Sequence, residues 1–141
     1  MTSLLEKTLI VGFGTLILIM IFPTINQYVN NIYRYDEERT DIDKFINLVE
    51  IIDDGINQIE EKNINVFNSS IEIPENLKII IKRNQIVYSL LINNDLCERK
   101  KIYNSTLAEK EFFFDFSFKG TLKIKLKESI IQINISSIKS T

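Results

Sequence analysis

Hydrophobic positions divide the chain into three parts with different spacings. From Thr8 to Ile25 no residue is charged, and most are Leu, Ile, Val, Phe or Gly. From Ile42 to Ile59 apolar residues recur every three or four positions, which predicts one apolar face of a helix. After Asn65 the spacing changes to every second residue, which predicts strands with one buried face. This order predicts an α+β fold, with a long N-terminal helix whose outer half packs on a C-terminal antiparallel β-sheet or sandwich.

The first apolar run is long enough to cross a bilayer. At about 1.5 Å per residue, a helix over this run just spans a hydrocarbon core of about 30 Å. A cleaved signal peptide would need a basic start and a small-residue cleavage site. Glu6 offsets Lys7, and no such site lies between Phe22 and Tyr28. We therefore expect a retained membrane helix.

The charges on either side of the run predict its orientation. Lys7 precedes the run, whereas residues 34–43 carry two arginines among five carboxylates. The positive-inside rule then places the N-terminus in the cytoplasm and the rest of the chain outside. Three Asn-x-Ser/Thr sequons, at Asn68, Asn104 and Asn134, are N-glycosylation acceptors on that outer side. Asn134 is the most favourable, because it falls on the polar face of a predicted strand.

Helical spacing continues beyond the membrane run and predicts one helix from about Ser3 to Glu61. The apolar stripe lapses just before Thr40, which begins a sequence that can cap a new helix. Either one long helix or two helices meeting near Thr40 fits. We expect an N-terminal helical segment of residues 1–62 and a β head domain of residues 63–141.

The alternating segments predict an antiparallel meander of roughly five to seven short strands. Lys82–Gln85 has the pattern of a hairpin turn, and Lys119-Gly120 that of a two-residue turn. The four phenylalanines that alternate over Phe112–Phe118 predict core packing rather than a ligand platform. The helix stripe Ile42–Ile59 is the expected cover of the apolar face. The alternating segments are Leu77–Lys82, Ile86–Ile92, Phe112–Phe118, Leu122–Leu126 and Ile131–Ile135.

Composition excludes several kinds of site. The 141 residues are 45% hydrophobic and 26% charged with a net charge of -2, which suits one domain with an appendage and no nucleic-acid partner. Histidine is absent and Cys97 is the only cysteine. This removes His-based triads, His/Cys metal sites and an intrachain disulfide. No spacing of Asp and Glu points to an acid–base pair, so we expect no enzyme, no cofactor and no metal.

The N-terminal residues resemble those of type IV pilins. Thr2-Ser3-Leu4-Leu5-Glu6 matches the mature start of that family, in which a small polar pair and two apolar residues precede a glutamate and an apolar run. Pro23 lies in a stretch similar to the family's proline-containing segment. Ile71–Ile79 is similar to part of archaeal pilin-like and archaellum accessory proteins. The likeness covers the architecture of the whole chain, but motifs only over residues 2–29.

Two departures from the family pattern concern processing and disulfides. The family's basic leader is missing before Thr2, so we expect either a sequence close to the mature form or a start at Met1 without that processing. The C-terminal disulfide of many bacterial pilins is also missing, because Cys97 has no second cysteine. This favours an archaeal-type relative.

The resemblance implies a structural subunit of an extracellular filament, a helical homopolymer formed through the N-terminal helices. It implies a membrane location before assembly, and a prepilin peptidase and an assembly ATPase with its platform as partners. Glu6 would pair with the N-terminal amine of a neighbouring subunit, and Pro23 would soften the helix.

Other interpretations stay open. From the residues alone, Glu6 is a solvated carboxylate beside Lys7 at the membrane edge, and Pro23 is an interfacial helix break. The alternative function is a membrane-anchored accessory protein, of the archaellum type, whose β domain binds the cell envelope or caps a filament. A third hypothesis is a bitopic sensor, but Met1–Lys7 is too short to carry a signal inward.

Overall fold

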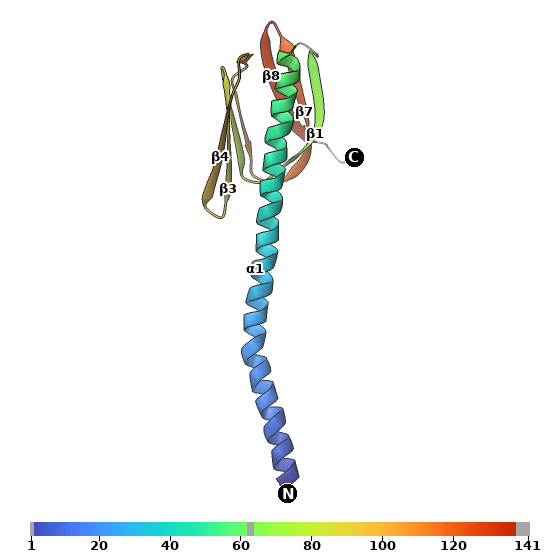
Figure 1. Ribbon diagram of the computed structural model, residues 1–141, viewed down its shortest axis with the longest axis vertical. Coiled ribbons are helices and arrows are strands. Elements are labelled where there is room, and N and C mark those ends of the chain that lie inside the picture. The colour runs from blue at the N-terminus through green and yellow to red at the C-terminus, as the bar shows by residue number, and fades with distance from the viewer. Residues whose placement is uncertain (1, 62–63, 138–141) are drawn as a thin grey trace. The chain divides into compact units, whose positions relative to one another are not determined.

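The computed structural model describes residues 2–61 and 64–137, which form one helix followed by eight strands (Figure 1). The fold class is α+β, as the sequence predicts. The chain divides by packing into two units, residues 1–39 and residues 40–141. The expected segment boundary at residues 62 and 63 lies outside the described residues. The elements are α1 (Thr2–Glu60), β1 (Val66–Ile73), β2 (Leu77–Lys82), β3 (Gln85–Ile92), β4 (Asp95–Ile102), β5 (Thr106–Leu107), β6 (Lys110–Phe114), β7 (Phe118–Lys127) and β8 (Ile130–Ser137).

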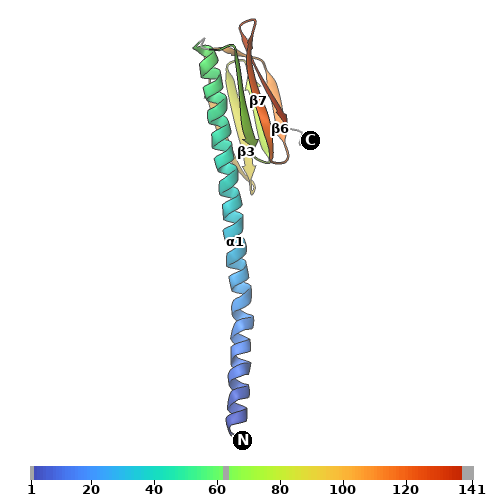
Figure 2. The same cartoon turned by 90° about the vertical axis from the view of Figure 1, so that its right-hand side faces the viewer.

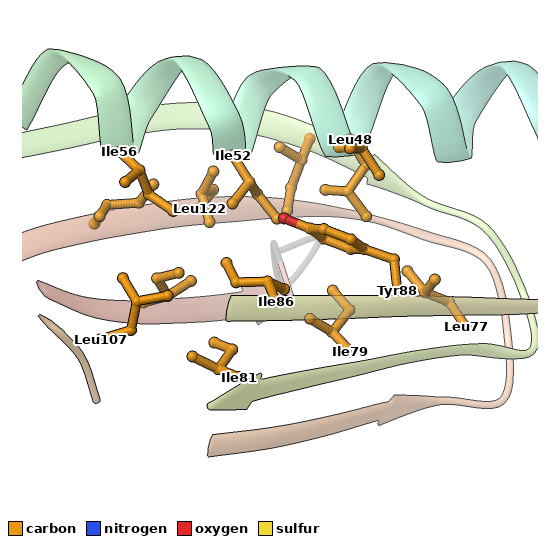
Figure 3. Packing of buried hydrophobic residues seen from close by; sticks show 14 of the residues in the cluster. Leu48, Ile52, Ile56, Leu77, Ile79, Ile81, Ile86, Tyr88, Leu107 and Leu122 are labelled. Atoms are coloured by element: carbon orange, nitrogen blue, oxygen red, sulfur yellow. The ribbon is translucent and has the colours of Figure 1, made fainter. Parts of the chain in front are cut away.

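From Phe45 to Ile59 the helix stripe that the spacing predicts is the buried face of α1 in the second unit, whereas Ile42, the first residue of the predicted stripe, is 39% exposed. The question of one helix or two is settled in favour of one, because α1 continues through Thr40. Figure 3 shows side chains of α1 pointing toward the strands, where they meet Tyr88 and Leu122. The fully buried side chains of α1 are Phe45, Leu48, Val49, Ile52, Ile56 and Ile59.

The strands form two four-stranded sheets, so the expected single meander is wrong. One sheet has the order β1-β7-β8-β5 and the other the order β4-β3-β2-β6. All pairs are antiparallel except β5 with β8, which are parallel over two residues. The chain changes sheets four times, at β1 to β2, β4 to β5, β5 to β6 and β6 to β7. As one result, β1 pairs with β7 rather than with the adjacent β2. Such long-range pairing leaves no mark in the local alternation of residues.

One hydrophobic core joins the helix and both sheets. In the second unit, α1 lies along one side of the strands (Figure 2). Alternate residues of each central strand turn inward, while their neighbours face outward. The buried strand residues of the core are Ile71, Ile73, Leu77, Ile79, Ile81, Ile86, Tyr88, Leu90, Leu122, Ile124, Ile131 and Ile133, with Tyr103 and Leu107 from the segments between β4 and β6.

The two predicted turns have different outcomes. The hairpin at Lys82–Gln85 is confirmed, because these two residues are the last pair of the β2–β3 register. The turn at Lys119-Gly120 is wrong, because both residues lie inside β7. Gly120 instead allows a close approach of β8: a Cβ there would lie 2.8 Å from the carbonyl oxygen of Ser136. A glycine in a strand can mark such an approach as well as a turn.

The phenylalanine stripe is only partly in the core. Phe112, Phe114 and Phe118 are half-buried against the core, as predicted. Phe114 and Phe118 meet edge to face with ring centroids 5.5 Å apart. Phe116 is 70% exposed, which contradicts the prediction for that residue. The chain leaves one sheet after Phe114 and joins the other at Phe118, so the strand alternation does not extend across Phe116.

Two hairpins have loops of two residues in the left-handed region. Asn93 and Asn94 link β3 to β4 with φ of 49° and 69°. Glu128 and Ser129 link β7 to β8 with φ of 51° and 67°. Positive φ at both positions is the geometry of a type I′ turn, which matches the twist of the flanking strands. Asparagine tolerates this region better than glutamate or serine does.

Candidate functional site

The first unit is a helix that can cross a membrane by its length and composition. Its most apolar 18-residue window has a mean hydropathy of 2.3, and none of that window is buried. Large apolar side chains along it are open, for example Leu4 at 75% and Phe22 at 69%. Such a surface needs either lipid or other apolar helices around it. The unit is therefore compatible with membrane anchoring, as the sequence predicts.

The hydroxyl groups in the apolar run are satisfied within the helix itself. Each threonine donates to the carbonyl oxygen four residues earlier, a bond that removes the need for a water partner in lipid. These bonds let threonine occupy an apolar environment. The pairs are Thr8 with Leu4 at 2.8 Å, Thr15 with Val11, and Thr24 with Met20 at 3.4 Å.

Glu6 and Pro23 both lie on α1 but are not brought together. They are 17 positions apart, which corresponds to about 25 Å along a helix. Glu6 is exposed and immediately precedes Lys7 and the apolar run. No ion pair among residues 2–61 and 64–137 involves Glu6. Its carboxylate is available for a partner outside the chain.

Pro23 lies inside α1 without ending it. Proline has no N–H group, so the carbonyl of Ile19 loses its helical donor. The next carbonyl, that of Met20, has the Thr24 hydroxyl as an additional partner. The helix therefore continues through Pro23 with one fewer backbone bond, which makes this the weakest point of the apolar run.

All three sequon asparagines are exposed, but their surroundings differ. Asn68 on β1 and Asn134 on β8 both lie opposite Lys123 of β7 in the strand register. The Asn134 amide oxygen accepts a hydrogen bond of 3.0 Å from the Lys110 ammonium group. Asn104 lies in a bend between β4 and β5 and has no such partner within the described chain. The Asn104 amide is therefore more accessible than that of Asn134, which the sequence alone ranks first as an acceptor.

Polar contacts also link α1 to the rest of the second unit. The ammonium group of Lys101 lies 3.0 Å from the Asp53 carboxylate. The backbone N–H of Ser105 donates to the Glu60 carboxylate at 2.9 Å. Both carboxylates lie at the margin of the apolar stripe. These contacts fix the register of α1 on the strands, and they are not visible in the sequence because their partners are more than 40 residues apart.

Two tyrosines are buried next to these contacts. The Tyr88 hydroxyl lies near Tyr103, and the Tyr103 hydroxyl lies near Tyr88 and Asp53, but within the described residues neither hydroxyl makes a hydrogen bond of ordinary geometry. Burial raises the pKa of Tyr88 far above its ordinary 10.0, and the nearby Tyr103 adds to the rise. Burial also raises the pKa of Tyr103, and the negative charge of Asp53 raises it further. Both side chains therefore stay neutral at physiological pH.

No group of three or more His, Cys, Asp or Glu side chains in residues 2–61 and 64–137 is arranged to hold a metal ion. No family model, curated protein or solved structure matches this chain. The class that the structure defines is an α+β protein with an apolar N-terminal helix compatible with membrane anchoring.

Proposed function

We propose that this chain is a structural subunit of an extracellular type IV pilus-like filament. In this proposal it is held in the cell membrane by α1, with its N-terminus in the cytoplasm, until it is assembled. A prepilin peptidase and an assembly ATPase with its platform belong to the same proposal. The observation that supports it best is the division of α1: the apolar side chains before Thr40 are open, whereas most apolar side chains after it are buried against the strands.

Glu6 provides a mechanism for setting the register between subunits. When apolar helices leave the bilayer and pack together, a carboxylate among them costs several kcal/mol unless it meets a cation. The terminal amine of a neighbouring subunit is such a cation. Because Glu6 has no ion-pair partner among the described residues, its charge is available for this contact. Pro23 weakens one turn of the same helix, which lets it adjust between lipid and filament.

The test is the substitution Glu6→Gln, which keeps the shape of the side chain but removes its charge. Removing one partner of a buried ion pair costs about 3–5 kcal/mol, so filaments should be absent or short while the protein still enters the membrane. The matched control is Glu75→Gln, because Glu75 is an exposed turn residue with no ion pair within the described chain. Filament yield is measured by electron microscopy at equal membrane abundance. Normal filaments from Glu6→Gln would refute the role of the carboxylate.

The second candidate is a membrane-anchored accessory protein whose β domain binds the cell envelope or caps a filament. It is favoured by apolar side chains on the outer face of the β4-β3-β2-β6 sheet, which point away from the core. Exposed apolar residues that gather on one face mark contact surfaces. A protein that stays in the membrane fraction and forms no filaments in wild-type cells would support this candidate. The residues are Leu91, Leu96, Ile102 and Phe113, which are 45–69% exposed.

A further inference from the structure

The second unit carries an acidic surface on α1. The side of α1 that points away from the strands, from residue 43 to residue 58, has six exposed residues. Three are carboxylates, three are amides and none is basic. We call this surface the acidic stripe. It consists of Asp43, Asn47, Glu50, Asp54, Asn57 and Gln58.

The same unit carries a basic surface on β7. Alternate residues of β7 point outward, and four of these five are lysines. Lys119 is paired with Glu72 at 3.1 Å, whereas Lys123, Lys125 and Lys127 have no ion pair within the described residues. The neighbouring strands contribute mostly neutral polar side chains to this face, among them Asn68 and Gln132. We call Lys123, Lys125 and Lys127 the lysine row.

The two surfaces face in opposite directions. Ile124, between Lys123 and Lys125, points inward, and its Cδ1 atom would lie 2.7 Å from a Cβ added at Gly55 of α1. The lysine row is therefore on the side of β7 that faces away from α1. Glu50 and Asp54 lie on the side of α1 that faces away from β7. The acidic stripe and the lysine row of one molecule cannot meet.

We propose that the acidic stripe of one molecule binds the lysine row of the next copy of this chain. The inference rests on the proposed function, because it names the contact between neighbouring β domains in the filament. Charge complementarity supports a second copy as the partner. The protein has a net charge of -2, yet it separates a surface without basic residues from a row of three lysines. Opposite surfaces of this kind give orientation and partner choice.

The spacing of the charges fits the same partner. Glu50 and Asp54 are four residues apart on a helix, which places them about 6 Å apart along its axis. Lys123 and Lys125 are two residues apart on a strand, which places them about 7 Å apart. Two carboxylates on one copy can therefore face two ammonium groups on the next at the same time.

The contact is heterologous, because it joins two different surfaces. A contact of this kind leaves one free acidic stripe and one free lysine row at the two ends of any chain of copies. Repetition then produces an open-ended assembly unless the rotation between copies closes a ring. A symmetric pair would use the same surface twice and would stop at two copies. The charge arrangement thus favours a polymer over a dimer.

The experiment is cross-linking of the full-length protein in intact cells. In a Cys97→Ser background, the pair Asp54→Cys and Lys125→Cys is treated with a flexible bis-maleimide. Because each chain then carries both halves of the contact, the expected product is a ladder of multimers. The matched control pairs Asp54→Cys with Lys82→Cys, since Lys82 is an exposed lysine at a turn of the other sheet. Equal ladders from both pairs, or dimers only, would overturn the proposal.

The remaining charges test whether the contact is electrostatic. In the ladder-forming chain, Lys123→Glu should reduce multimers at least about tenfold because it places like charges together. Adding Glu50→Lys should restore them, and high salt should weaken the original ladder. An unchanged ladder with Lys123→Glu would overturn the proposal. If the Lys123→Glu chain keeps its ladder but no longer binds an acidic polysaccharide, the polysaccharide and not a second copy is the partner of the lysine row, and the proposal is overturned.

Failure of this inference is separable from failure of the proposed function. Filaments without a ladder from the Asp54→Cys and Lys125→Cys chain would overturn the contact and leave the filament intact. A ladder in membranes of cells that form no filaments would support the contact and refute the filament.

Discussion

Removing the hydroxyl group of Tyr88 should make the second unit more stable. The side chain is 0% exposed, and its hydroxyl lies near Tyr103 without making a hydrogen bond of ordinary geometry to any described residue. Burial of such a hydroxyl costs about 1–3 kcal/mol in mutational data. The void left by one oxygen atom costs only a few tenths of a kcal/mol. We therefore expect Tyr88→Phe to raise the free energy of unfolding by about 1–2 kcal/mol.

Calorimetry of the full-length protein in detergent micelles measures this effect. For a domain of about 100 residues, a gain of about 1–2 kcal/mol corresponds to an increase in Tm of about 5–10 °C. The control is Tyr88→Leu, which removes the ring as well and should lower Tm, because it opens a cavity between Ile52 of α1 and the strands (Figure 3). A Tm for Tyr88→Phe at or below that of the wild type would show that the hydroxyl is satisfied, and would refute the reasoning.

Three further predictions concern pH, a turn and a glycan. The pKa values of Tyr88 and Tyr103 are raised by burial above the ordinary 10.0, so these groups bind protons more tightly in the folded state. Above about pH 10 the free energy of unfolding should therefore fall by about 1.4 kcal/mol per pH unit for each tyrosine, and a double Phe variant should lack this slope in denaturant titrations. Ser129→Gly should raise the free energy of unfolding by about 0.5–1 kcal/mol, because glycine adopts the φ of 67° without strain. The control is Asn94→Gly, which should raise it less because asparagine already tolerates this region. An equal or larger gain at Asn94 would contradict the argument. Intact-mass measurement of the native protein should show glycan that Asn104→Gln removes; a glycan that persists in this variant would place the acceptor elsewhere.

The helix and the central strands were predictable because their residues alternate between core and solvent. Each buried hydrophobic side chain of α1 lies in the predicted stripe, and the β2–β3 hairpin forms where the sequence predicts it. Nearly every residue of β4 is exposed, so alternation between apolar and polar positions does not arise there. In β1 only Ile71 and Ile73 are fully buried, and two alternating buried residues are too few to predict a strand. Alternation between apolar and polar residues predicts a strand only where one face of that strand is buried, so it does not predict strands at a sheet edge that are mostly exposed.

The candidate site was predictable only in part. The positions of Glu6 and Pro23 on an open apolar helix followed from hydropathy and from the family resemblance. The acidic stripe and the lysine row did not, because a surface depends on which faces the tertiary packing leaves open. Lysines at alternate positions of β7 predict an exposed face, but only the burial of Ile124 against α1 shows which side of the molecule it occupies.

The pairing of β1 with β7 also determines the order in which the head can form. The strands β2, β3 and β4 are joined by two-residue turns, so they can assemble as soon as that stretch of chain is available. By contrast, β1 pairs only with β7, where Val66 lies opposite Lys125, 59 residues later. Because synthesis proceeds from the N-terminus to the C-terminus, the β4-β3-β2 hairpins can fold first. Until β7 has been made, β1 has no strand to pair with. A chain that stops before Phe118 leaves the edge of β1 open, which makes incomplete chains targets for proteases and chaperones.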